Sequence, residues 1–326
     1  MVLCGLGVAE GVIRHYERRL SVDVAHIRSI PDVSKKVGEN PAESALFMGS
    51  SLVRYGMDLA VIKEQLEIEG VTAPRLLKVN PDASTIGEWY YYLNTYFVKA
   101  GNTPHVLVIG FANNHLEDQR ALRPERLGAF CCRLADTPEV FSQDVKGFGP
   151  RMDFLLSMGF CCCAHRDRVR SRVLDELIPD YRNVTTQIND TLRAHQPVKA
   201  AAAAPVTFTR FQRLLDLAGE HNIRVAVVAM PVQQSYDVDQ NVLEMTRKAD
   251  GLFLDCRHIE ALSDKSYLDE IHLNPDGARI FSRAFTQRLA SWDPITGFEQ
   301  VKVGSKQAKL QSKVEVPLTV SAILTK

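Results

Sequence analysis

The stretch that most constrains the fold of this chain runs from Ala45 to Gly56 and reads ALFMGSSLVRYG. Its apolar run, Ala45 to Met48, is too short for a helix and predicts a buried strand, while segment 58–70 has apolar positions at helical spacing. Gly49 permits a sharp turn between the two. Ser51 is therefore expected at the carboxyl end of a strand, where open parallel sheets bind their ligands.

A serine in such a turn is either a polar loop residue or a nucleophile, and a nucleophile needs a base. Asp269-Glu270-Ile271-His272 supplies a carboxylate three residues before a histidine. Such a carboxylate can fix the imidazole tautomer and leave the other ring nitrogen free to accept a serine proton. Ser51, His272 and Asp269 are thus the candidate nucleophile, base and orienting residue. No G-x-S-x-G sequence occurs, which disfavours an α/β-hydrolase nucleophile elbow.

These two motifs together resemble the SGNH (GDSL-like) hydrolase superfamily. Gly49-Ser50-Ser51-Leu52 is similar to its first block, and Asp269-x-x-His272 is similar to its last block. The resemblance implies a flavodoxin-like three-layer fold and an esterase, lipase, deacetylase or carbohydrate O-acyltransferase that uses no cofactor. It also implies an oxyanion site formed by the amide of Ser51, a glycine amide from block two and an asparagine side chain from block three.

The sequence departs from this family at block three. A predicted strand at 105–111 (HVLVIGF) is followed by Ala112, Asn113, Asn114 and His115. Either Asn113 takes the asparagine position and Phe111 replaces the glycine, or Gly110 is the motif glycine and one residue is inserted. We expect Asn113 or Asn114 to hold the oxyanion, and His115 beside them is a candidate substrate contact.

Block two also departs, because Ala83 precedes Ser84-Thr85 where a glycine is expected. The backbone amide near Ala83 is the candidate donor from this block. Loss of one oxyanion donor typically costs about 3 to 4 kcal/mol of transition-state stabilisation. A real gap would therefore give a slow enzyme, or a non-catalytic domain that binds glycan or acts as a scaffold.

The chain has 326 residues, of which 45% are hydrophobic, enough for one large α/β domain with insertions. We expect an N-terminal segment at 1–40, a hydrolase domain at 41–292 and a C-terminal extension at 293–326. A helical insertion at 115–205 interrupts the domain and is predicted to cap the carboxyl edge of the sheet. Five short apolar runs predict a parallel sheet covered by helices on both faces: 45–48, 75–79, 105–111, 223–230 and 251–255.

Helices are predicted between these strands at 58–70, 84–100, 122–134, 152–177, 208–221, 237–248 and 276–292. The helix at 84–100 is rich in aromatic side chains, which either pack against the sheet or line a sugar site. Beyond residue 292 the chain becomes polar and lysine-rich and ends in VEVPLTVSAIL, an extra edge strand or a tail.

The apolar start, MVLCGLGVAEGVI, is shorter than the ~20 residues needed to span a bilayer. It is either an ordinary first helix or the remainder of a membrane anchor or export signal. Similarity to bacterial SGNH-like proteins of the cell envelope favours an extracytoplasmic, membrane-anchored location. Basic and acidic residues number 39 each, so nothing favours a nucleic-acid partner. The oligomeric state is left open.

The seven cysteines include two adjacent runs, Cys131-Cys132 and Cys161-Cys162-Cys163. This spacing is not that of zinc or redox motifs, so we interpret them as small buried hydrophobes. The sequence therefore predicts a serine-dependent hydrolase of an acyl ester or acetylated carbohydrate, without a metal. An O-acyltransferase follows instead if a sugar hydroxyl replaces water.

Overall fold

The computed structural model describes residues 2–119, 122–181, 183–185 and 205–296. Its centre is a five-stranded parallel sheet in the order β2-β1-β3-β4-β5, which is the flavodoxin-like order. The α/β class and the position of every strand were predicted correctly. The strands are β1 (Ser44–Gly49), β2 (Arg75–Val79), β3 (Val106–Phe111), β4 (Arg224–Ala229) and β5 (Leu252–Asp255).

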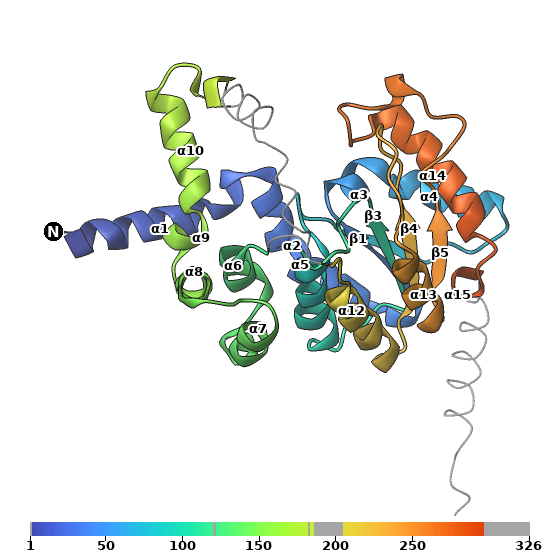
Figure 1. Ribbon diagram of the computed structural model, residues 1–326, viewed down its shortest axis with the longest axis horizontal. Helices are drawn as coiled ribbons and strands as arrows, with labels where there is room; N and C mark the ends of the chain where they lie inside the picture. Colours follow the sequence, from blue (N-terminus) through green and yellow to red (C-terminus); the bar gives the residue numbers. More distant parts are fainter. Residues whose placement is uncertain (1, 120–121, 182, 186–204, 297–326) are drawn as a thin grey trace, which may run out of the picture.

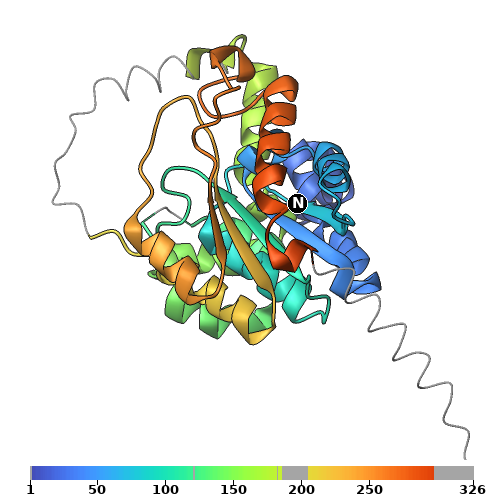
Figure 2. The same ribbon diagram turned by 90° about the vertical axis from the view of Figure 1, so that its right-hand side faces the viewer.

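Helices cover both faces of this sheet, as Figures 1 and 2 show. Along β1, Ala45 and Phe47 face one apolar core, and Leu46 and Met48 face the other, because successive strand residues point to opposite sides. The first core includes α3 (Ser51–Gly56), α4 (Leu59–Ile68) and α14 (Pro275–Leu289). The second includes α2 (Val22–Glu39), α5 (Ile86–Tyr92), α12 (Thr209–Glu220) and α13 (Gln240–Lys248).

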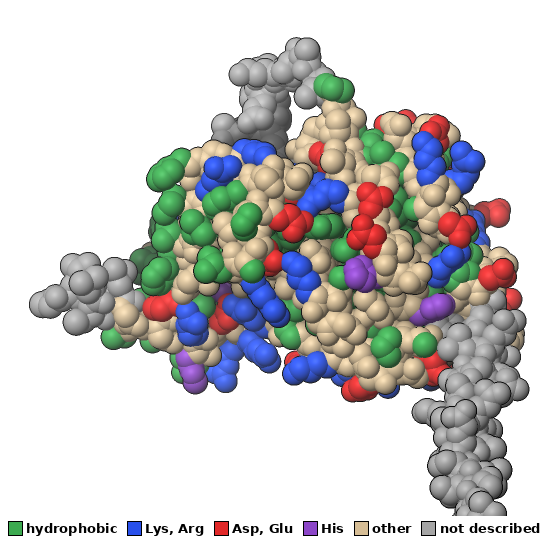
Figure 3. Space-filling view, turned by 90° about the horizontal axis from the view of Figure 1, so that it is seen from below, with side chains coloured by type: hydrophobic (Ala, Val, Ile, Leu, Met, Phe, Trp, Pro, Cys, Tyr) green, Lys and Arg blue, Asp and Glu red, His purple; other side chains and the backbone are tan. Residues whose placement is uncertain are grey.

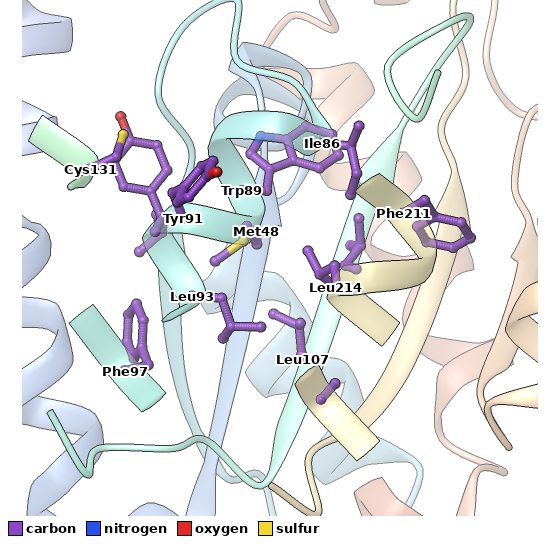
Figure 4. Packing of buried hydrophobic residues seen from close by; sticks show 14 of the residues in the cluster. Met48, Ile86, Trp89, Tyr91, Leu93, Phe97, Leu107, Cys131, Phe211 and Leu214 are labelled. Atoms are coloured by element: carbon purple, nitrogen blue, oxygen red, sulfur yellow. The ribbon is translucent and has the colours of Figure 1, made fainter. Parts of the chain in front are cut away.

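The aromatic helix α5 packs against the sheet (Figure 4) and continues into a π-helical turn, Leu93–Val98. Trp89, Tyr91 and Tyr92 are at most 1% exposed. The packing interpretation is therefore correct for these three residues, and they do not line a sugar site.

The insertion between β3 and β4 is helical, but the single helix predicted at 152–177 is wrong. The chain forms α8 (Phe148–Gly159), α9 (Cys161–Ala164) and α10 (Arg166–Leu177). The break at Phe160 has a physical cause, since Glu10 accepts hydrogen bonds from the amides of Cys161 and Cys162, both 2.9 Å long. These contacts satisfy the start of a new helix. Before α8 lie α6 (Pro124–Arg126), a π-helical turn (Leu127–Cys131), a 3₁₀ turn (Leu134–Asp136) and α7 (Thr137–Gln143).

The described part of this insertion packs mainly against α1 (Val2–Leu20) and α5, to the left of the sheet in Figure 1. Only its beginning, around Arg123 and Arg126, reaches the loop that follows β2. The cap over the carboxyl edge stays a prediction. The alanine run at 199–204 and the chain from 297 onward, with its predicted strand, lie outside the described residues.

The N-terminal segment forms α1 and α2, followed by a 3₁₀ turn at Pro41–Glu43. Among the helices that the structure describes, none is long and apolar enough to cross a membrane. Figure 3 shows acidic and basic side chains interspersed on the face seen from below. Remaining short elements are Asp264–Ser266 and α15 (Asp293–Thr296).

The cysteines are only partly buried as predicted. Cys131, Cys161 and Cys256 are buried, whereas Cys162 is half-buried and its thiol contacts a Glu10 oxygen at 2.7 Å. Over the described ranges, no group of three or more His, Cys, Asp or Glu side chains is placed to hold a metal ion.

Candidate active site

Ser51 lies where β1 passes directly into α3. Two glycines allow α3 to lie close to the strands at this turn. Gly49 pairs with Gly110 in the β1–β3 register, and the side chain of Val53 packs over both. A Cβ on Gly49 would lie 2.7 Å from the Gly110 carbonyl oxygen, and one on Gly110 would lie 2.7 Å from Sδ of Met230. Larger residues would therefore push α3, and Ser51 with it, away from the sheet.

The structure brings Ser51, His272 and Asp269 into one hydrogen-bonded chain. Ser51 Oγ lies 2.8 Å from His272 Nε2, and His272 Nδ1 lies 2.8 Å from Asp269 Oδ2. Asp269 Oδ1 also accepts the backbone N–H groups of Ile271 at 2.9 Å and His272 at 2.8 Å. Burial opposes ionisation of Asp269, but the hydrogen bonds from His272 and these amides lower its pKa below the usual value.

The loop that carries His272 is fixed on both sides. Leu268 donates its amide to the His272 carbonyl at 2.7 Å, and an isolated antiparallel bridge joins Tyr267 to Leu273. Asn274 then caps α14 by accepting the amide of Gly277 at 2.9 Å. The HLNPDG sequence, residues 272–277, thus places His272 just before α14.

Ala83 and Asn113 share an unusual backbone conformation. Their φ angles are +49° and +50°, in the left-handed region that favours glycine. Ala83 therefore adopts a conformation that glycine would occupy more easily. Strained residues of this kind cluster at functional sites.

Two backbone amides at this edge are free to bind a ligand. Within the described ranges, the N–H groups of Ser51 and Ala83 make no hydrogen bond. The neighbouring Ser84 hydroxyl donates to the Gly49 carbonyl at 3.1 Å, which ties the block-two loop to the end of β1. Alanine at this position therefore still presents a backbone N–H, and its role as an oxyanion donor stays a prediction.

The block-three residues divide into two environments. Asn113 and Asn114 are exposed at the carboxyl end of β3, beside β1. His115 is only 8% exposed, and its ring packs edge-on against Trp89 with centroids 6.1 Å apart. The structure therefore places His115 in packing, apart from the surface that the two asparagines share.

The positions of the motifs in the sheet characterise the fold. A serine follows the first strand of a flavodoxin-like sheet, and D-x-x-H follows the last strand and lies in the loop just before α14. The chain has an SGNH-like hydrolase fold.

Known proteins similar to this chain are found among solved structures. No family model and no curated protein matches it. Among solved structures, it is similar to a catalytic mutant of Axe2, an acetylxylan esterase from Geobacillus stearothermophilus, at 11% identity and a TM-score of 0.40. That match covers 78% of this chain and 96% of the other. A second catalytic mutant of Axe2 matches at 9% identity and a TM-score of 0.38, with the same coverage.

Sequence reasoning missed the charged residues that surround the block-two loop of this SGNH-like site. Arg54, on α3, donates to Asp82 at 3.0 Å, and Asp23 on α2 accepts the Asp82 amide at 2.7 Å. Arg54 had one signal in the sequence, its place three residues after the candidate nucleophile Ser51. Asp23 had no such signal in the sequence, because its hydrogen-bond partners lie far away along the chain.

Proposed function

We propose that this protein is a serine-dependent acyl-ester hydrolase, an esterase or carbohydrate deacetylase of SGNH type. The observation that carries the proposal is the chain from Ser51 Oγ through His272 to Asp269, at 2.8 Å for each step. It lies at the carboxyl edge of the sheet, beside the amides of Ser51 and Ala83, which make no hydrogen bond within the described ranges.

In this proposal His272 Nε2 takes the proton of Ser51 Oγ as the oxygen attacks the acyl carbon. The amides of Ser51 and Ala83, with the side chain of Asn113 or Asn114, stabilise the oxyanion. His272 then gives its proton to the departing alcohol, and an acyl-serine remains. Water attacks this ester, gives a proton to His272 and releases the acid, while Ser51 recovers its proton.

Asp269 keeps the imidazole in the tautomer that this cycle requires. Its lowered pKa maintains the carboxylate in the charged form, which accepts the Nδ1 proton and stabilises the imidazolium. The loop is open to water, since the Asp269 side chain is 55% exposed and that of His272 is 19% exposed. This openness favours hydrolysis over transfer to a sugar hydroxyl, which would use the same residues in a polysaccharide O-acyltransferase.

Hydrolysis of p-nitrophenyl acetate tests the proposal. We expect His272→Ala to lower kcat by about 10³-fold or more and Asp269→Asn to lower it by a similar factor. The matched control is His258→Ala, because His258 is exposed and belongs to the same loop region. Equal turnover in all four proteins would overturn the proposal. Acetate release from an acetylated oligosaccharide, with and without an unacetylated acceptor, separates hydrolase from transferase.

A further inference from the structure

We propose that Asp23 is a positioning residue, which holds the loop of residues 80–83 so that the Ala83 amide can serve the site. The inference rests on the proposed function, and it extends the site to α2, a helix outside the predicted hydrolase domain. Asp23 lies in the first turn of α2 and is only 8% exposed.

The amides that precede Ala83 are held by α2. Asn80 donates its N–H to His26 Nε2 at 2.9 Å, and Asp82 donates its N–H to Asp23 Oδ1 at 2.7 Å. The Ala83 N–H remains free within the described ranges. Side chains of α2 therefore accept the N–H groups of Asn80 and Asp82, on either side of Pro81. The next N–H group, that of Ala83, stays available to a ligand.

Arginines hold the carbonyl groups of the same loop. Arg54 donates to the Asn80 oxygen at 3.0 Å, and Arg126 donates to the Asp82 oxygen at 2.7 Å. Arg123 donates to the Ala83 oxygen at 2.9 Å. The peptide groups on both sides of Ala83 are thus held by side chains from the start of the insertion, and Arg54 on α3 holds the Asn80 carbonyl at the beginning of the loop.

The Asp23 carboxylate connects these arginines to one another. It accepts two hydrogen bonds from Arg126, at 2.8 and 3.1 Å, and one from Arg168 at 3.1 Å. Arg54 lies 3.8 Å away. Because Arg126 is 3% exposed, loss of the Asp23 charge removes the carboxylate that hydrogen-bonds this buried guanidinium and leaves Glu88, at 3.8 Å, as a counter-charge.

The strain at Ala83 makes the loop depend on this support. At φ +49°, an alanine persists only where its surroundings determine the conformation. When Asp23 no longer holds the loop, Ala83 relaxes toward negative φ and its amide turns away from the oxyanion. Glycine at 83 would occupy the left-handed region without that support.

Asp23→Asn tests the inference, because it removes the charge and keeps the shape. We expect kcat for p-nitrophenyl acetate to fall about tenfold, since oxyanion donors act mainly in the transition state, while KM changes less than about twofold. Asp32→Asn is the matched control, because Asp32 lies on the same helix and is 60% exposed. Among the described residues, its one charged partner is Lys35 at 3.9 Å. It should match the wild type.

A rescue separates positioning from a merely structural role. Adding Ala83→Gly to Asp23→Asn should recover about fivefold in kcat, because glycine removes the left-handed penalty. A general loss of folding would show as a lowered Tm, and adding Ala83→Gly would not restore it. Wild-type kcat in Asp23→Asn, or a loss that Ala83→Gly does not recover, would overturn the inference.

Hydrogen–deuterium exchange of residues 80–85 tests the positioning role of Asp23 without a measurement of activity. Exchange there should be faster in Asp23→Asn than in the wild type and Asp32→Asn. If Asp23→Asn does not fold, Arg168→Gln removes a partly exposed partner of the same carboxylate. It should make the amides of residues 80–85 exchange faster. An inactive wild type would refute the proposed function alone, whereas unchanged exchange would refute the role of Asp23.

Discussion

At the scale of single residues, the site depends on a close approach between β1, β3 and α3. Gly49 and Gly110 are paired in register, and Val53 packs over both. The sequence indicated the turn at Gly49 but gave no sign that Gly110 is equally constrained. That constraint comes from a helix and a strand that meet only in the folded protein.

Gly110→Ala should therefore destabilise the protein by about 1 to 3 kcal/mol, the usual cost of overpacking. The new Cβ would overlap Val53 and lie 2.7 Å from Sδ of Met230. Urea denaturation measures the change. Gly219→Ala is the control, because nothing lies within 4 Å of its Cβ position in α12. Equal stability of the two variants would show that the approach is not constrained.

His26 should make stability depend on pH. Burial, and then the charge of Arg54, lower its pKa from 6.5 to about 4. Between these values the unfolded chain binds a proton that the folded chain does not, so stability is lost as pH falls from 6.5 to 4. The loss reaches about 3 kcal/mol, because the buried site beside Arg54 disfavours the charged imidazolium. Protonation also removes the acceptor of the Asn80 amide.

Denaturation at pH 7 and pH 4.5 tests this dependence. His26→Gln has a neutral acceptor and should lose less stability over that range than the wild type. Exposed His221 supplies the control, since His221→Gln should leave the pH dependence unchanged. An identical pH dependence in all three proteins would refute the role of His26.

At the scale of elements, the strands and most helices followed from local patterns of apolar residues. Each predicted strand begins or ends within two residues of the observed one. The helices of the insertion were harder to predict, because contacts between residues distant in sequence break it into short helices. The break at Phe160 depends on Glu10, which belongs to α1 and lies 151 residues from Cys161.

One buried carboxylate, Asp144, fastens the insertion to the helices beneath it. Its side chain is 3% exposed and contacts Arg210 at 2.7 Å, Arg213 at 3.0 Å and the Tyr91 hydroxyl at 2.6 Å. Asp144 follows α7, the arginines lie on α12, and Tyr91 lies on α5.

We expect Asp144→Ala to destabilise the protein by about 3 to 5 kcal/mol, because it leaves two mostly buried arginines without this partner. Thermal and urea denaturation would measure the loss. Asp216→Ala on α12 removes an exposed carboxylate whose one hydrogen-bond partner in the described part of the chain is Gln212. It should change stability by less than about 0.5 kcal/mol. A loss in Asp144→Ala no larger than that would contradict a fastening role.

At the scale of the whole molecule, the first and last strands along the chain, β1 and β5, lead to the predicted reacting groups. Ser51 and the Asp269–His272 pair could be predicted because each belongs to a short motif whose spacing has chemical meaning. Asp23, Arg126 and the other charges around Ala83 belong to no motif. Their arrangement depends on how α2 and the insertion pack beside β2, and local sequence does not specify that packing.

Labelling with a fluorophosphonate probe tests the central claim most directly, because the probe reacts only with an activated serine. Wild type and Ser50→Ala should be labelled, since Ser50 only caps α3, while Ser51→Ala and His272→Ala should not. Circular dichroism confirms that each variant is folded. Labelling that persists in Ser51→Ala, or a folded wild type that stays unlabelled, would contradict a nucleophilic Ser51.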